Sequence, residues 1–192
     1  EFSEHYHHNY SVLATPAEEI TLSADGKTII YQDQKGMEDP LRKHHTSSVT
    51  RDIWRYDATT GRHTNLTRHA GEDRSPVLAP DGQTLYFLSE RDGGSFNVYR
   101  TSATRAGAAP EAVTTFTGSP VRFLSVSDGG TLCYTYDGEI YTQQAGGRPQ
   151  RVAVSLFHDD NDRILRQTLS KGATCAAVSA DGKQVAFVAR GE

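Results

Sequence analysis

Short apolar stretches along the chain repeatedly end at an Asp-Gly pair and resume directly after it. Asp-Gly between alternating apolar runs is a strong signal for a β-hairpin, because glycine readily adopts the positive φ that the turn demands. Four segments follow this pattern, with the sequences LSADGKTIIYQD, LAPDGQTLYFLS, VSDGGTLCYTY and VSADGKQVAFVA. They predict four hairpins around Asp25, Asp81, Asp128 and Asp181, at intervals of 56, 47 and 53 residues.

Two further strand-like segments follow each of the first three hairpins. The third strands, whose side chains alternate with period two, are predicted at Asp52–Asp57, Asn97–Arg100 and Glu139–Thr142. The fourth strands follow turn residues and are predicted at His63–Thr67, Glu111–Thr114 and Gln150–Val152. Four short antiparallel strands repeated in tandem are typical of a β-propeller blade.

We therefore expect an all-β fold, a partial β-propeller of four-stranded antiparallel blades, with about three complete blades and part of a fourth. Residues 1–192 would form a single propeller segment, with repeats at approximately 18–67, 70–117, 119–152 and 173–192, the last one truncated. A two-sheet sandwich is the alternative, although it does not need so regular a period. At roughly 45 residues per blade, a ring of six or seven needs about 270 to 315 residues, so we expect an arc of a larger ring.

Composition and charge narrow the possible partners. The chain is 36% hydrophobic and 23% charged, which is typical of a soluble globular protein, and its formal net charge is -4. A nucleic-acid partner would require a basic face, which the scattered basic residues do not supply. No apolar run approaches the ~20 residues of a membrane span, and no signal peptide is visible at the N-terminus.

The residue types that often carry chemistry do not form a recognisable site. Cys133 and Cys175 have no zinc-binding spacing, and we expect buried thiols, with a disulfide between them left open. On a strand, His5 and His7 would share one face and His8 would lie on the other, which gives at most two ligands. The sequence contains no Gly-x-Ser-x-Gly and no phosphate-binding motif. We predict no catalytic residue, no cofactor and no metal in these residues.

The second repeat resembles a known group of propellers. Its segment Ser75–Tyr99 combines a Pro-Asp-Gly turn, the run Ser89-Glu90-Arg91-Asp92-Gly93 and a Val-Tyr strand, and it is similar to the repeat of the TolB, tricorn protease and prolyl oligopeptidase propellers. Within this group the unusual segment 35–54 resembles the N-terminal propeller of bacterial tricorn-like serine peptidases.

This resemblance implies a non-catalytic propeller that gates or guides peptide substrates. The implied partners are peptides or unfolded polypeptides. The resemblance also implies contacts with the rest of the same chain, which would contain further blades, a PDZ domain and a serine protease core. Whether the protein forms an oligomer is left open. The alternatives are a TolB-like protein-binding scaffold and the propeller lid of a prolyl oligopeptidase-like hydrolase. The implied location is the periplasm or envelope of a bacterium, with the cytoplasm as the alternative.

The long insertion 36–50 in the first repeat is the segment with most functional content, since loops of more than about 12 residues are often functional. Its basic residues Arg42, Lys43, His44 and His45 are candidates for peptide contact, because charge-assisted hydrogen bonds would suit acidic peptide ends. The alternative is a loop that only covers an exposed strand edge.

Overall fold

The computed structural model describes residues 16–36, 39, 41–44, 49–155 and 173–189, and all its regular elements are strands. The chain divides into two compact units, Glu1–Ala153 and Val154–Glu192, each of which is described by itself. Within the described residues no helix is long or apolar enough to cross a bilayer.

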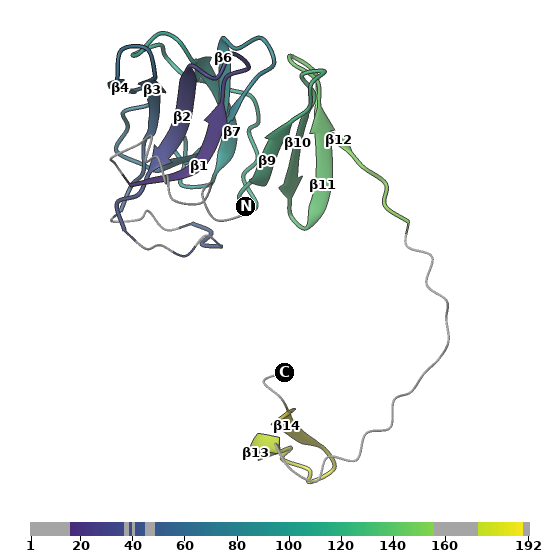
Figure 1. Ribbon diagram of the computed structural model, residues 1–192. Helices are drawn as coiled ribbons and strands as arrows, with labels where there is room; N and C mark the ends of the chain where they lie inside the picture. The colour runs from purple at the N-terminus through teal and green to yellow at the C-terminus, as the bar shows by residue number, and fades with distance from the viewer. Residues whose placement is uncertain (1–15, 37–38, 40, 45–48, 156–172, 190–192) are drawn as a thin grey trace, which may run out of the picture. The chain divides into compact units, whose positions relative to one another are not determined.

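The first unit contains three four-stranded antiparallel sheets, each in simple meander order (Figure 1). The first blade consists of β1 (Ala17–Leu22), β2 (Thr28–Asp33), β3 (Ile53–Asp57) and β4 (Arg62–Asn65). The second consists of β5 (Asp73–Leu78), β6 (Thr84–Ser89), β7 (Asn97–Ser102) and β8 (Glu111–Ala112). The third consists of β9 (Arg122–Val126), β10 (Leu132–Tyr136), β11 (Glu139–Gln143) and β12 (Gln150–Arg151). The predicted partial propeller is confirmed, and a two-sheet sandwich is excluded.

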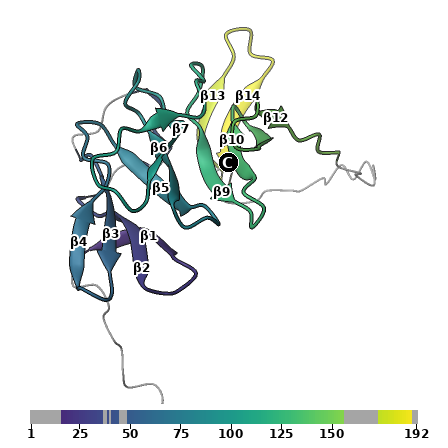
Figure 2. The same cartoon turned by 90° about the horizontal axis from the view of Figure 1, so that it is seen from above.

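The first strands of the three blades lie toward the centre of this arrangement. Strand β5 contacts both β1 and β9, and in the view from above these strands come together while β4 lies at the outside (Figure 2). This is the arrangement expected of blades set around a common axis. The innermost strands β1, β5 and β9 therefore carry whatever faces that axis.

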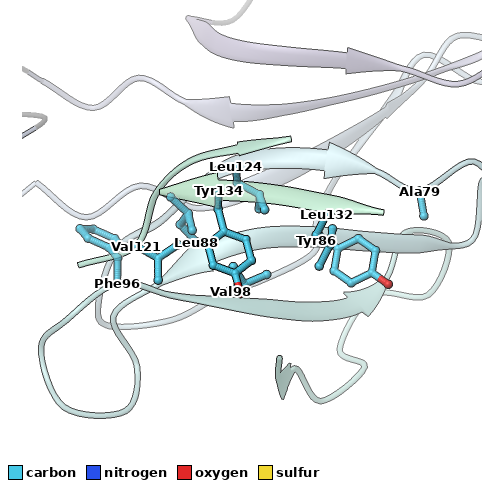
Figure 3. Packing of buried hydrophobic residues seen from close by; sticks show 9 residues of the cluster. All are labelled: Ala79, Tyr86, Leu88, Phe96, Val98, Val121, Leu124, Leu132 and Tyr134. Carbon is cyan, nitrogen blue, oxygen red and sulfur yellow. The ribbon is translucent and has the colours of Figure 1, made fainter. Parts of the chain in front are cut away.

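The middle blade is buried on both faces, and strand β6 shows why. Its side chains alternate, so Leu85 and Phe87 pack against the first blade whereas Tyr86 and Leu88 pack against the third. Figure 3 shows the cluster on the third-blade side, which also contains the fully buried Tyr134. Two apolar interfaces between neighbouring blades, which we call seams, thus join the three blades into one unit. The first seam lies between the first and second blades, and the second seam lies between the second and third.

Every innermost strand contains a β-bulge of the same kind. In β1 the two residues Glu19 and Ile20 lie opposite the single residue Tyr31 of β2, because the register shifts between Glu18 and Thr21. The equivalent pairs are Ser75 with Pro76 opposite Phe87, and Phe123 with Leu124 opposite Tyr134. The first residue of each pair has a positive φ, at 47°, 53° and 54° for Glu19, Ser75 and Phe123. A repeated bulge opposite a buried aromatic residue is a built feature of the blade.

The hairpin turns are held by the side chains that the sequence pattern places there. Asp25 accepts hydrogen bonds from the Ser23 hydroxyl and the Lys27 backbone N–H, at 2.6 and 3.0 Å. These bonds to Ser23 and Lys27 hold the pKa of Asp25 below its ordinary value.

The third turn differs from the sequence alignment of the repeats. Its positive-φ glycine is Gly130, with a φ of 77°, rather than the Gly129 of the Asp-Gly pair. The Gly130 N–H donates to the Ser127 carbonyl, as the Gly26 N–H donates to the carbonyl of Ser23. The third turn therefore matches the first when Ser127 is aligned with Ser23, and Asp128 then occupies the position of Ala24.

The second unit contains one described hairpin, β13 (Ala173–Val178) with β14 (Val185–Ala189). Its bulge places a positive φ of 52° on Cys175, as in the three blades. Both cysteines are free, and Cys175 is exposed while Cys133 is half-buried. The expectation of buried thiols is wrong for Cys175, because this side chain lies at the bulge of a hairpin whose faces are open within the described residues. The histidines at 5, 7 and 8 and the link between the units lie outside the described residues.

Candidate functional site: an axial cavity walled by the bulges

An open cavity of about 570 Å³ lies where the innermost strands of the three blades meet. Its wall contains both residues of each bulge, together with neighbouring side chains of the strands and of the insertion. The lining residues are Glu19, Ile20, Leu41, Arg74, Ser75, Pro76, Val77, Leu88, Arg122, Phe123 and Leu124. Six of these eleven residues belong to the bulges, so the bulge that recurs in each blade forms a large part of the site.

Three of the apolar residues of this wall are unusually exposed. Ile20, Leu41 and Phe123 leave 59%, 61% and 72% of their surface accessible. Scattered exposed apolar residues are common, but several that converge on one concavity indicate a binding surface.

Charged groups flank the apolar wall. Two basic residues, Arg74 and Arg122, line the cavity against a single acidic residue, Glu19. Burial lowers the pKa of Arg74, whose guanidinium also stacks over the Phe96 ring at 4.1 Å from its centre. The cavity therefore combines an apolar surface with a net positive charge.

The insertion reaches this site through a buried ion cluster. Arg42 donates to Glu72 at 2.6 Å and pairs with Glu90 at 2.8 Å, and Arg51 pairs with Glu72 at 2.6 Å. The side chains of Arg42 and Glu72 have no exposed surface. Burial alone would lower the pKa of Arg42, but its hydrogen bonds to Glu90 and Glu72 raise that pKa, so the guanidinium is charged.

The four basic residues predicted to contact peptides are thus placed differently from one another. Arg42 is buried, and in the described residues its guanidinium serves as an anchor of the insertion. Lys43 is exposed and borders a smaller cavity of about 170 Å³ that also contains Asp137. His44 lies with its Nδ1 at 3.3 Å from the Ser95 hydroxyl, and His45 lies outside the described residues. Peptide contact by Lys43, His44 and His45 stays a prediction.

Sequence reasoning missed the residues that wall the cavity. Glu19, Ser75 and Phe123 share no residue type, so they do not stand out as a repeated motif. Among the described residues there is no cluster of three or more His, Cys, Asp or Glu side chains that could hold a metal ion.

Solved structures with a fold similar to that of this chain include a TolB and the tricorn protease. No family model matches the chain. Dipeptidyl-peptidase 5 from Porphyromonas endodontalis is 38% identical over 86 residues, which is 43% of this chain and 12% of that protein. The crystal structure of the tricorn protease matches with a TM-score of 0.65 and 24% identity, over 90% of this chain and 16% of that one.

A TolB structure from Agrobacterium tumefaciens matches with a TM-score of 0.58 and 22% identity, over 73% of this chain and 50% of that one. The chain thus covers half or less of each of these proteins. At such identities the structural matches show the fold, and they confirm a propeller resembling those of TolB and the tricorn protease.

Proposed function

We propose that these blades are the non-catalytic propeller portion of a serine peptidase of the tricorn-like kind, in which the propeller receives unfolded peptide and guides it. The observation that carries the proposal is the axial cavity, because its exposed apolar wall is suited to the side chains of an unfolded polypeptide. A dipeptidyl-peptidase among the sequence relatives and a tricorn protease among the structural ones support a peptidase context.

The division of labour follows from the residues present. The wall supplies apolar surface and guanidinium groups, which bind and orient a chain but do not attack a peptide bond. The nucleophile, and with it the PDZ domain and protease core implied by the resemblance, belongs to other parts of the protein in this proposal. Lys43, His44 and His45 would contact the substrate beside the cavity.

A protein-binding scaffold is the second candidate, and the match to a TolB structure favours it. In that case the same axial surface would hold a folded partner, and no protease would be attached. A propeller lid on a prolyl oligopeptidase-like hydrolase is a third arrangement, in which the cavity still meets peptides. The proposed location is the bacterial periplasm or envelope, with the cytoplasm as the alternative.

The test uses the full-length protein and unfolded casein. We expect hydrolysis of casein that a serine-directed fluorophosphonate abolishes, while the inhibited protein still binds labelled casein in a fluorescence anisotropy titration. Folded, disulfide-bonded ribonuclease is the matched substrate and should neither bind nor be cleaved. Absence of casein binding would refute the proposal, and binding of folded ribonuclease without any hydrolysis of casein would favour the scaffold.

A further inference from the structure

The most exposed aromatic side chain of the propeller blades lies in the cavity wall rather than on the outer surface. Phe123 is 72% exposed although it belongs to strand β9, and it is joined there by Ile20 of β1 and Leu41 of the insertion. Three separate parts of the chain thus contribute one exposed apolar residue each to the same concavity. Such convergence is what a pocket for an apolar group requires.

The backbone at Phe123 sets the position of its side chain. Its φ of 54° lies in the left-handed region, which bulky residues seldom adopt. The same conformation recurs at Glu19 and Ser75, so it is held by the fold of the blade. The bulge directs Phe123 to the axis, while its partner Leu124 is buried in the cluster of the second seam.

Leu41 is held in place from two sides while its side chain stays open. The Arg122 guanidinium donates to the backbone carbonyls of Leu41 and Arg42, at 2.7 and 3.2 Å. The Leu41 N–H donates to the Asp39 carboxylate at 2.8 Å, and the neighbouring Arg42 is fixed by its buried ion pairs. A surface that is positioned before the ligand arrives loses less entropy on binding.

The charges of the wall restrict what can lie beside an apolar group. Arg74 and Arg122 oppose one carboxylate, Glu19, so a lysine or arginine of a ligand would meet like charge. A carboxylate of a ligand would instead meet charges of opposite sign. The lining therefore complements apolar residues with acidic or neutral neighbours.

We infer that this cavity is a subsite for one apolar side chain of an unfolded peptide, with Phe123 and Leu41 as its walls and with basic neighbours disfavoured. This inference rests on the proposed function and specifies its substrate class. An aromatic or branched aliphatic side chain fits a cavity of about 570 Å³ with room for the adjoining backbone.

The first experiment measures peptide selectivity with the inhibited full-length protein. The probes are fluorescent peptides of glycine and serine, blocked at both ends, with a single phenylalanine or a single alanine at the centre. Burial of the ring should make the phenylalanine peptide bind about tenfold more tightly. Placing glutamate on both sides of the phenylalanine should preserve binding, whereas lysine on both sides should weaken it.

The second experiment assigns the selectivity to the cavity. Phe123→Ser and Leu41→Ser should each abolish the preference for phenylalanine over alanine, and Phe123→Leu should retain it. Ile140→Ser is the matched control, since Ile140 is also an exposed apolar residue (40%) but does not line the cavity. An unchanged preference in both serine variants, or equal binding of all peptides, overturns this inference alone. If neither these peptides nor casein bind, the proposed function fails with it.

Discussion

The two seams that flank the middle blade are stabilised by different kinds of interaction. The first seam, between the first and second blades, has an apolar cluster of Ile30, Ile53, Leu66, Leu85, Phe87, Tyr99 and Ala103. It is supplemented by the buried ion cluster of Arg42, Arg51, Glu72 and Glu90. The second seam, between the second and third blades, is apolar and aromatic, with Phe116 stacked on Tyr136 at 3.9 Å between ring centres.

The difference shows how an insertion can be fixed to a blade. Apolar packing loses stability in proportion to the volume removed, whereas a buried ion cluster fails as a unit because each partner satisfies another. The insertion offers few apolar anchors among its described residues, and its position is set by Arg42 and Arg51. The first seam should therefore be the more sensitive of the two to a single polar substitution.

Glu72→Ala is expected to have the largest effect. It leaves the guanidinium groups of Arg42 and Arg51 buried without their common carboxylate, and removal of one member of such a cluster costs about 3–5 kcal/mol. Urea unfolding followed by circular dichroism measures the loss. Glu111→Ala is the control, because its pair with Arg100 is exposed and contributes under about 1 kcal/mol. Equal losses in the two variants would show that burial of the cluster does not matter.

Leu132→Ala probes the second seam. Leu132 is fully buried, and the cavity left by this substitution should lower the free energy of unfolding by about 3 kcal/mol. Leu85→Ala, at an equally buried position of the first seam, is the matched variant and should cost a similar amount. A much larger cost for Leu85 would mean that the apolar part, and not the charge, distinguishes the seams.

Tyr134→Phe should have the smallest effect at neutral pH. The Tyr134 hydroxyl donates to the Gln143 side-chain oxygen at 2.7 Å, and loss of this bond should cost about 1 kcal/mol. Burial raises the pKa of Tyr134 to about 12, above its ordinary value of 10. The stability that this group contributes is therefore complete below pH 10 and is lost as the pH rises through 10 toward 12.

The same variant tests this pH dependence. Urea unfolding at a series of alkaline pH values should show a shallower decline for Tyr134→Phe than for the native chain, since the variant has no phenol to ionise at this site. Tyr141→Phe, at a partly buried position of the same aromatic group, serves as the control. Parallel declines in all three proteins would contradict the assignment.

Strands could be predicted from the sequence where the alternation of apolar and polar residues and the positions of the turn residues indicated the same strand. The hairpins follow from Asp-Gly, and the pairing of β6 with β7 follows from alternation in both segments. The bulges were not predicted, because the backbone conformation at Glu19, Ser75 and Phe123 is set by the opposing strand rather than by their own residue type. Two signals were available: the aromatic residues of each second strand, and Pro76 in the segment before the second Asp-Gly turn, since proline in a strand is usually confined to a bulge or an edge.

The candidate site was predictable only in part. The length of the insertion marked it as a segment of interest, but its sequence could not distinguish the role of Arg42 from that of Lys43. The difference comes from Glu72 and Glu90, which lie far away along the chain and reach Arg42 only in the folded blades.

The recurrent bulge also has an evolutionary consequence. Its residues lie outside the regular ladder, so the pairing on either side does not depend on which side chain stands at the first, left-handed position. The left-handed position excludes mainly β-branched residues, and Glu19, Ser75, Phe123 and Cys175 differ widely within that limit. Selection can therefore exchange the lining of the axis one blade at a time, while the scaffold that presents it is inherited unchanged.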